Sequence, residues 1–447
     1  TEPVLAKEKQ VVKNEKRQRV DNAPYGFNQQ IIDRNLYPKD HPYNWQVIGS
    51  LEDLQNATLE DVKTFFRKWY VPNNSTLVLS GDFDPAQAKK WVEKYFNEIP
   101  KGDEIVPQKK RPGTVNETKL LYFEDNFARL PMLTMAWPAV ELYNKDSYAI
   151  NILTQYLSQG KNAPLNQVLV DDLKLTSFTS MGTYTSELAG QIQLSVRGFN
   201  NVDLNKINDG ILKAFENFEE NGIPEKDLNR IKAGLETRFY NSLSSVLGKG
   251  TNLASFNTYA GDPGFINKEI GYTLNVTKDD VMRVFNKYIK GKNFIATSFV
   301  PKGMQKLALK NSKEAIIKEE KIVQGAEEKF DPKIAAKYTK TPSKINRSVE
   351  PPYGKAPKLS VPNVWENELS NGVKVFGIEN SEVPLVQFNL VIDGGQLLEK
   401  MDKLGVANLT ASLMNRGTKN KTVAQLQEAV QELGASIRVS ASKENIT

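Results

Sequence analysis

The stretch TLEDVKTFFRKWYVPNNSTLVLSGDFDP at residues 58–85 decides the fold, because TKDDVMRVFNKYIKGKNFIATSFVPKG at residues 277–303 has the same design. The two stretches align at a constant offset without a gap. The matching positions are Thr58, Asp61, Val62, Phe66, Lys68 and Asn74 in the first, and Thr277, Asp280, Val281, Phe285, Lys287 and Asn293 in the second. This agreement predicts a duplicated structural unit.

The duplicated stretch has a clear local structure. Each copy opens with Thr-x-x-Asp, which resembles a capping box in which the threonine hydroxyl caps free amides at a helix start. A valine and a phenylalanine four residues apart then mark one buried helical face. The β-branched run after each helix predicts a strand.

A third copy begins near Trp365. Residues 120–139 and 373–395 share one order: a strand, a turn with an acidic residue and asparagine, a proline, and an alternating strand. Residues 338–365 hold five prolines with lysine and serine, which indicates an extended linker. A disordered tail is disfavoured, because patterned sequence resumes after them.

These patterns predict an α+β fold built from repeated units of about 220 residues, each a largely antiparallel sheet packed with helices. The expected layout is the last part of one unit (1–105), a whole unit (112–330), a linker (331–364) and the first part of a third unit (365–447). The expected strands include residues 131–137, 190–199 and 436–442, and the expected helices include residues 148–158 and 226–248.

Composition excludes several classes of protein. The net charge is only +6 over 447 residues, and charges of both signs alternate in segments such as 7–19 and 310–321. Such mixed faces favour neither a nucleic-acid nor a membrane partner.

The chain has no cysteine, which rules out disulfides and cysteine metal sites. No apolar run reaches the roughly 18 residues of a membrane span. The opening TEPVLAKEK is neither a signal peptide nor a natural start, so we expect an internal fragment.

Residues 8–26 and 41–84 resemble the insulinase/pitrilysin family of zinc metallopeptidases. In that family a helix reading Glu-x-x-Val-x-x-x-Glu precedes a His-Pro loop, a Phe-x-x-x-Tyr-x-Pro-x-Asn helix exit and a Val-x-x-Gly-Asp strand end. The matching residues are Glu8, Val11, Glu15, His41, Pro42, Gly49, Phe66, Tyr70, Pro72, Asn74, Val78, Gly81 and Asp82. The paired units and long linker are also similar to the family's two-halved clam architecture. The resemblance covers essentially the whole chain.

The resemblance implies a metal-site role for two glutamates. Glu15 aligns with the family's zinc-binding glutamate, and Glu8 aligns with a second glutamate that supports the site. Residues seven apart lie on one helical face, about 10.5 Å apart along the axis. One carboxylate could then bind zinc while the other fixes the orientation of the histidine ligands. The alternative is an ordinary solvated face on a helix rich in lysine and glutamate.

The family's core motif is missing. His-x-x-Glu-His supplies two zinc ligands and the general base, and we expect it upstream of residue 1. This fragment alone therefore cannot complete a three-ligand site, so we expect Zn²⁺ in the intact parent and absent or weak binding here. His41 is the only histidine, and we expect it to be a loop residue ahead of Pro42.

The third unit resembles a degenerate copy. Residues 405–418 are similar to the family's histidine motif, but Asn408, Ala411 and Ser412 stand where histidine, glutamate and histidine would be. These residues cannot bind zinc well, so this half would close a chamber and bind substrate. The resemblance implies a substrate-contacting Arg and Tyr within the stretch that matches residues 165–181. Asp171, Leu175 and Ser177 occupy that region, so the substrate-binding residues stay unassigned.

The resemblance implies a zinc endopeptidase that degrades or processes peptides and unfolded segments, with a zinc-bound water as nucleophile. One rival is a catalytically inactive member that acts as a peptide-binding or assembly subunit. Another is a purely structural repeat protein, in which Glu8 and Glu15 would point to solvent. The expected partners are a peptide or unfolded substrate and either a homodimer or the missing half of the same protein. We expect a periplasmic or secreted location over a cytoplasmic one, although a cysteine-free chain suits both.

Overall fold

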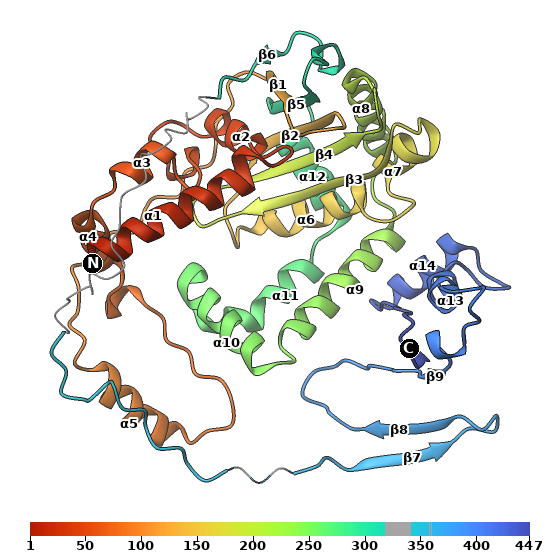
Figure 1. Ribbon diagram of the computed structural model, residues 1–447. Helices are drawn as coiled ribbons and strands as arrows, with labels where there is room; N and C mark the ends of the chain where they lie inside the picture. Colours follow the sequence, from red (N-terminus) through yellow and green to blue (C-terminus); the bar gives the residue numbers. More distant parts are fainter. Residues whose placement is uncertain (318–340, 357, 359) are drawn as a thin grey trace.

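The computed structural model describes residues 1–317, 341–356, 358 and 360–447 (Figure 1). The last residues expected in the whole unit, and the first part of the expected linker, lie outside the described residues. Within the described ranges, no helix combines the length and the apolar character that a membrane crossing requires.

A six-stranded mixed sheet has the strand order β3-β4-β2-β5-β1-β6 and lies in the upper part of the view in Figure 1. Its strands are β1 (Lys119–Asp125), β2 (Met132–Ala139), β3 (Thr176–Thr185), β4 (Gly190–Gly198), β5 (Ile295–Pro301) and β6 (Lys313–Glu314). The pairs from β3 through β5 are antiparallel, and β1 pairs in parallel with β5 and β6. The predicted α+β class is confirmed, with a mixed sheet in the whole unit.

One face of this sheet carries the main apolar core. Successive residues of a strand point to opposite faces, so Leu133, Met135 and Trp137 of β2 share one face. They are buried in the same cluster as residues of α6 (Lys145–Ser158), α8 (Leu204–Asn221) and α12 (Lys278–Tyr288). Helices α6, α8 and α12 therefore pack against the apolar face of the sheet.

The opposite face of the sheet is covered by α2 (Asn28–Leu36), which contributes buried apolar side chains such as Ile31 and Leu36 together with a polar layer. Asp33 of α2 is buried and accepts hydrogen bonds from Gln29, Gln46 and Gln191 at 2.8, 2.8 and 3.3 Å. Burial raises the pKa of the Asp33 carboxyl, and these hydrogen bonds oppose that rise. The amides satisfy the buried carboxylate, which is what allows α2 to pack there.

The remaining helices flank this core. α9 (Glu225–Ser242) is followed by α10 (Val246–Ser255) and α11 (Ile266–Leu274). The single helix expected over residues 226–248 is wrong. Helix α9 ends at Ser242. A new helix, α10, begins after Ser245, whose hydroxyl caps it by accepting a hydrogen bond from the Gly248 amide. Outside these segments, the helices are α1 (Glu2–Lys16), α3 (Leu51–Asn56), α4 (Leu59–Trp69), α5 (Pro85–Phe96), α7 (Pro164–Asn166), α13 (Val406–Met414) and α14 (Val423–Glu432).

The duplicated helices start alike but differ in burial. In α4 the Thr58 hydroxyl accepts from the Asp61 amide at 3.1 Å, and in α12 Thr277 accepts from Asp280 at 3.1 Å, so both predicted caps are confirmed. Phe285 of α12 is 1% exposed, whereas its counterpart Phe66 of α4 is 57% exposed. The same sequence pattern is thus packed in one copy and open in the other.

The strand expected after α4 does not form, whereas its counterpart after α12 is β5. A strand needs a neighbour for its backbone hydrogen bonds. Residues 76–80 instead lie beside helical segments: Asn257 donates to the Thr76 hydroxyl at 2.9 Å, and Gly250 of α10 lies close to Ser80. In the part of the chain that the structure describes, no strand pairs with them.

Residues 364–447 contain only short sheets. β7 (Val364–Glu368) and β8 (Lys374–Ile378) form a hairpin, and β9 (Ile392–Asp393) pairs with β10 (Asn445–Ile446). The strand expected over residues 436–442 is wrong, since only Ala441 forms a bridge, with Ile446. The chain turns back onto β10 after this bridge, so within the described residues the alternating stretch forms no continuous ladder.

The C-terminal helix α14 packs against α9. Lys226 of α9 forms ion pairs with Glu428 and Glu432 of α14 at 3.2 and 2.9 Å. Arg230 of α9 donates to the Gln431 side chain at 2.9 Å. Charged side chains therefore make up much of this contact.

Candidate metal-binding helix

Helix α1 carries both candidate glutamates. Its Pro3 lies in the first turn, where proline costs no intrahelical hydrogen bond, and the helix runs into the π-helical turn η1 (Arg17–Asp21). The Glu15 side chain is 39% exposed and pairs with Arg19 at 3.1 Å. Glu8 is exposed and makes no hydrogen bond or ion pair with a described residue.

The packed side of α1 is formed by lysines. Lys9 donates to the Gln55 carbonyl of α3 at 3.1 Å, and buried Lys16 pairs with Asp21 at 2.7 Å. At 100° per residue, Glu8 and Glu15 lie about a quarter turn around the helix from these lysines. The two glutamates therefore share a face that α3 does not cover.

The residues present do not fit a complete zinc centre. A protein zinc site needs at least three protein ligands. Among the described residues, no three histidine, cysteine, aspartate or glutamate side chains are gathered where they could hold a metal ion. Glu15 can offer one carboxylate, and among the described residues it pairs only with the exposed guanidinium of Arg19.

His41 is buried and engaged on both ring nitrogens. Its Nδ1 accepts from the Tyr43 amide at 3.0 Å, and its Nε2 lies 3.0 Å from the Arg111 carbonyl oxygen. An amide only donates and a carbonyl only accepts, so the ring is neutral with its proton on Nε2. Burial lowers the pKa of the imidazole. The ring also stacks on Tyr37, with centroids 4.7 Å apart. The predicted loop position ahead of Pro42 is confirmed, and His41 has no free nitrogen for a metal.

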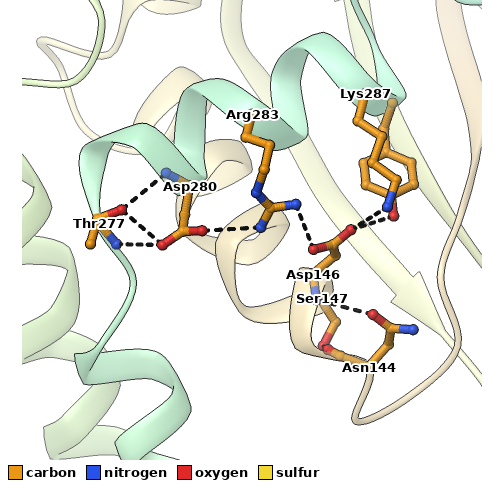
Figure 2. Close-up of polar contacts among 8 residues, drawn as sticks. Asn144, Asp146, Ser147, Thr277, Asp280, Arg283 and Lys287 are labelled. Carbon is orange, nitrogen blue, oxygen red and sulfur yellow. Dashed lines mark hydrogen bonds and ion pairs between the residues drawn. The ribbon is translucent and has the colours of Figure 1, made fainter.

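A charged cluster that was not predicted from the sequence lies between α6 and α12 (Figure 2). Asp146, at the start of α6, accepts from Arg283, Lys287 and Tyr288 at 2.8, 2.8 and 2.6 Å. Burial alone would raise the pKa of the Asp146 carboxyl, but these hydrogen bonds outweigh it and lower the pKa to about 2. Arg283 also pairs with Asp280 of the α12 cap at 3.1 Å. The cluster links helices α6 and α12 through hydrogen bonds, and it contains none of the candidate metal ligands.

Two models of one protein family match this chain. The model described as the peptidase M16 inactive domain matches residues 56–235, and the model described as insulinase (peptidase family M16) matches residues 374–447. Together they cover more than half of the chain. The chain belongs to the insulinase (M16) peptidase family. The expectation from the sequence resemblance is thus confirmed.

Similar proteins agree with the M16 assignment. The chain is 26% identical over 288 residues to the zinc protease PqqE of Helicobacter pylori, a match that spans 63% of this chain and 64% of that protein. A protease crystal structure from Helicobacter pylori superposes with a TM-score of 0.62 at 24% identity, covering 67% of this chain and 73% of that one. The crystal structure of the periplasmic protease PqqL of Escherichia coli superposes with a TM-score of 0.54 at 15% identity. The superposition covers 99% of this chain and 50% of the PqqL chain. These structural likenesses show an M16 fold.

The M16 match over residues 374–447 includes the degenerate motif of α13. Ala411 is 1% exposed, and the Ser412 hydroxyl donates to the Asn408 carbonyl of the same helix at 2.9 Å. Neither side chain is a metal ligand in this arrangement. In the other region that the resemblance singled out, Asp171 and Ser177 are exposed, with Ser177 on the edge strand β3.

Proposed function

We propose that this M16 chain is part of a zinc-dependent endopeptidase that degrades or processes peptides and unfolded segments. In this proposal Glu15 is one metal ligand, and Glu8 supports the site from the same helix. The observation that carries the proposal is the availability of the Glu15 carboxylate. Its single ion pair, with an exposed arginine, contributes little free energy, so a metal ion can replace that arginine.

In this proposal the remaining ligands and the general base come from outside this chain. The described residues offer no second and third ligand near Glu15, and a zinc site requires them. The match to the Helicobacter pylori zinc protease spans 64% of that relative's length, so further sequence can supply them. By this proposal the chain is inactive alone and gains its chemistry from the full-length protein.

We further propose that residues 1–105 are the C-terminal part of a first peptidase-like domain and that residues 112–330 form a second. Residues 365–447 would begin a third, degenerate domain after a linker at 331–364. The substrate is an unfolded peptide held between two halves, formed by a homodimer or by the rest of the same protein. The periplasmic name of the Escherichia coli relative supports a periplasmic or secreted location.

Cleavage of a quenched fluorescent peptide by the full-length protein tests this function. Glu15→Gln should abolish cleavage because it removes a ligand, and Glu8→Gln should lower it by about 10- to 100-fold, the usual effect of losing a ligand's support. Glu2→Gln, at an exposed position on the same helix, is the matched control and should cleave normally. Normal cleavage by Glu15→Gln would exclude the proposed ligand.

A second candidate function is an inactive subunit that binds peptides or assists assembly. The match to the family's inactive domain and the missing ligands of α13 favour it. It predicts that the full-length protein binds unfolded peptides but never cleaves them, with or without added zinc. The same assay therefore separates the two candidates.

A further inference from the structure

A cavity of about 420 Å³ lies where the C-terminal end of α1 meets η1, α2 and the loop leading into α3. This volume is within the range of sites that bind small molecules or short peptide segments. Residues from the turn after β1 close its other side, among them Phe127. The wall therefore combines side chains from the N-terminal helices and from the central sheet.

The cavity wall contains two arginines with unused hydrogen-bonding capacity. The Nη1 of Arg17 donates to Asn14 at 2.9 Å, but its Nε is buried with no partner among the described residues. The exposed guanidinium of Arg34 forms no hydrogen bond or ion pair with a described residue. A buried donor without an acceptor is unfavourable, so the ligand that suits this wall brings acceptor atoms.

Three carboxylates also line the wall, those of Asp21, Glu52 and Asp53, and in the described residues none of them forms an ion pair with either arginine. Asp21 pairs with Lys16 at 2.7 Å, and Asp53 accepts from the Ser50 hydroxyl at 2.7 Å at the start of α3. Within the described residues, the two guanidinium groups therefore have no carboxylate partner. Planar guanidinium groups bind carboxylates in a bidentate manner, which makes a carboxylate the favoured acceptor.

Aromatic side chains form the apolar part of the same wall. Trp45 is 56% exposed and Phe127 is 43% exposed, although both line the cavity. Large aromatic surfaces beside arginines are typical of the central part of binding interfaces. A ligand that covers them would gain free energy from apolar burial.

We propose that this cavity binds a peptide segment that carries a carboxylate next to an apolar side chain. Arg17 and Arg34 hold the carboxylate, while Trp45 and Phe127 pack against the apolar side chain. That the ligand is a peptide rests on the proposed function. The carboxylate is either a peptide C terminus or an acidic side chain, since both present the same two oxygens.

Calorimetric titration of the 447-residue chain with three peptides, in the presence of a chelator, tests the proposal. The peptides are acetyl-Ala-Ala-Phe-Ala with a free C terminus, the same peptide with a C-terminal amide, and acetyl-Ala-Ala-Phe-Glu with a C-terminal amide. The neutral amide should bind at least about tenfold more weakly than a carboxylate peptide. The carboxylate peptide that binds more tightly shows whether the cavity prefers a peptide C terminus or an acidic side chain. Equal affinity for all three peptides, or no binding of any, would overturn the proposal.

Substitutions locate the binding to this cavity. Arg34→Gln and Arg17→Gln should each lower the affinity for the carboxylate peptide by about tenfold. The affinity for the neutral amide peptide should stay unchanged. Arg438→Gln, at an exposed position in the third unit, is the matched control and should bind as the unaltered chain does. Because Arg17 also supports Asn14, the exposed Arg34 gives a result that does not depend on the packing of α1. Unchanged affinity in both cavity variants would contradict the assignment.

The outcome is separable from that of the proposed function, because the titration needs neither zinc nor cleavage. If no peptide binds while the full-length protein still cleaves, the cavity proposal is wrong and the peptidase stands. If the carboxylate peptide binds in the predicted way but the full-length protein never cleaves, the cavity stands and the peptidase is excluded.

Discussion

His41 shows how a single residue acquires a role that its loop position does not reveal. The sequence indicates a loop ahead of Pro42, but it does not show that Arg111, 70 residues later, supplies the carbonyl for Nε2. Tyr37 and Tyr43, four residues before and two after, are nearby aromatic residues in the sequence, and both contact the ring. The ring thus anchors this loop to the segment that leads into the sheet.

We predict that the stability of the chain falls as the pH drops through the ordinary histidine pKa of about 6.5. Burial lowers the pKa of His41 in the folded state, so the unfolded chain takes up a proton that the folded chain does not. The contribution is complete above pH 6.5 and is lost below it. Because the chain has one histidine, an NMR titration of its imidazole measures the folded pKa directly. An imidazole that titrates at or above 6.5 would contradict this account.

Among the elements, α4 and α12 show that capping is local whereas burial is not. The Thr-x-x-Asp signature fixes both helix starts, because the cap needs only residues three apart. Whether the apolar face is covered depends on partners far along the chain. For this reason the sequence predicted both caps correctly but predicted a strand at residues 76–80 that does not form.

We predict that Phe285→Ala lowers the free energy of unfolding by about 3–5 kcal/mol, because it leaves a cavity in the core. The matched change Phe66→Ala should cost well under about 1 kcal/mol, because that side chain is already largely in water. Urea unfolding of the two variants, followed by circular dichroism, gives both values. Similar losses in the two variants would show that α4 is packed in solution.

The α6–α12 cluster should make the chain sensitive to strong acid. Its hydrogen bonds hold the pKa of Asp146 at about 2, below the ordinary value near 3.9, so its stabilisation is present above that value and is lost as the pH falls toward 2. Asp146→Asn should cost about 1–3 kcal/mol at neutral pH and flatten this acid dependence. Asp209→Asn, an exposed position on α8, is the control. An acid profile that Asp146→Asn leaves unchanged would argue against the cluster.

For the whole molecule, the sequence predicted the α+β class and the family, because helical and strand periodicities are local and the family motifs have a fixed order. It could not predict contacts that join distant segments. Asp146 meets Arg283 across 137 residues, and Gln191 meets Asp33 across 158. The polar layer under α2 and the α9–α14 contact are of the same kind. The candidate metal ligand was predicted only through resemblance, since glutamates seven apart on a charged helix are common.

The central claim is that Glu15 of this M16 chain is one ligand of a zinc site that the chain cannot complete alone. The most direct test is the zinc content, by elemental analysis, of the full-length protein, of its Glu15→Gln and Glu2→Gln variants, and of the 447-residue chain. The account predicts about one zinc per molecule in the full-length protein and in Glu2→Gln, and little or none in Glu15→Gln and in the chain alone. Full zinc content in Glu15→Gln would contradict it.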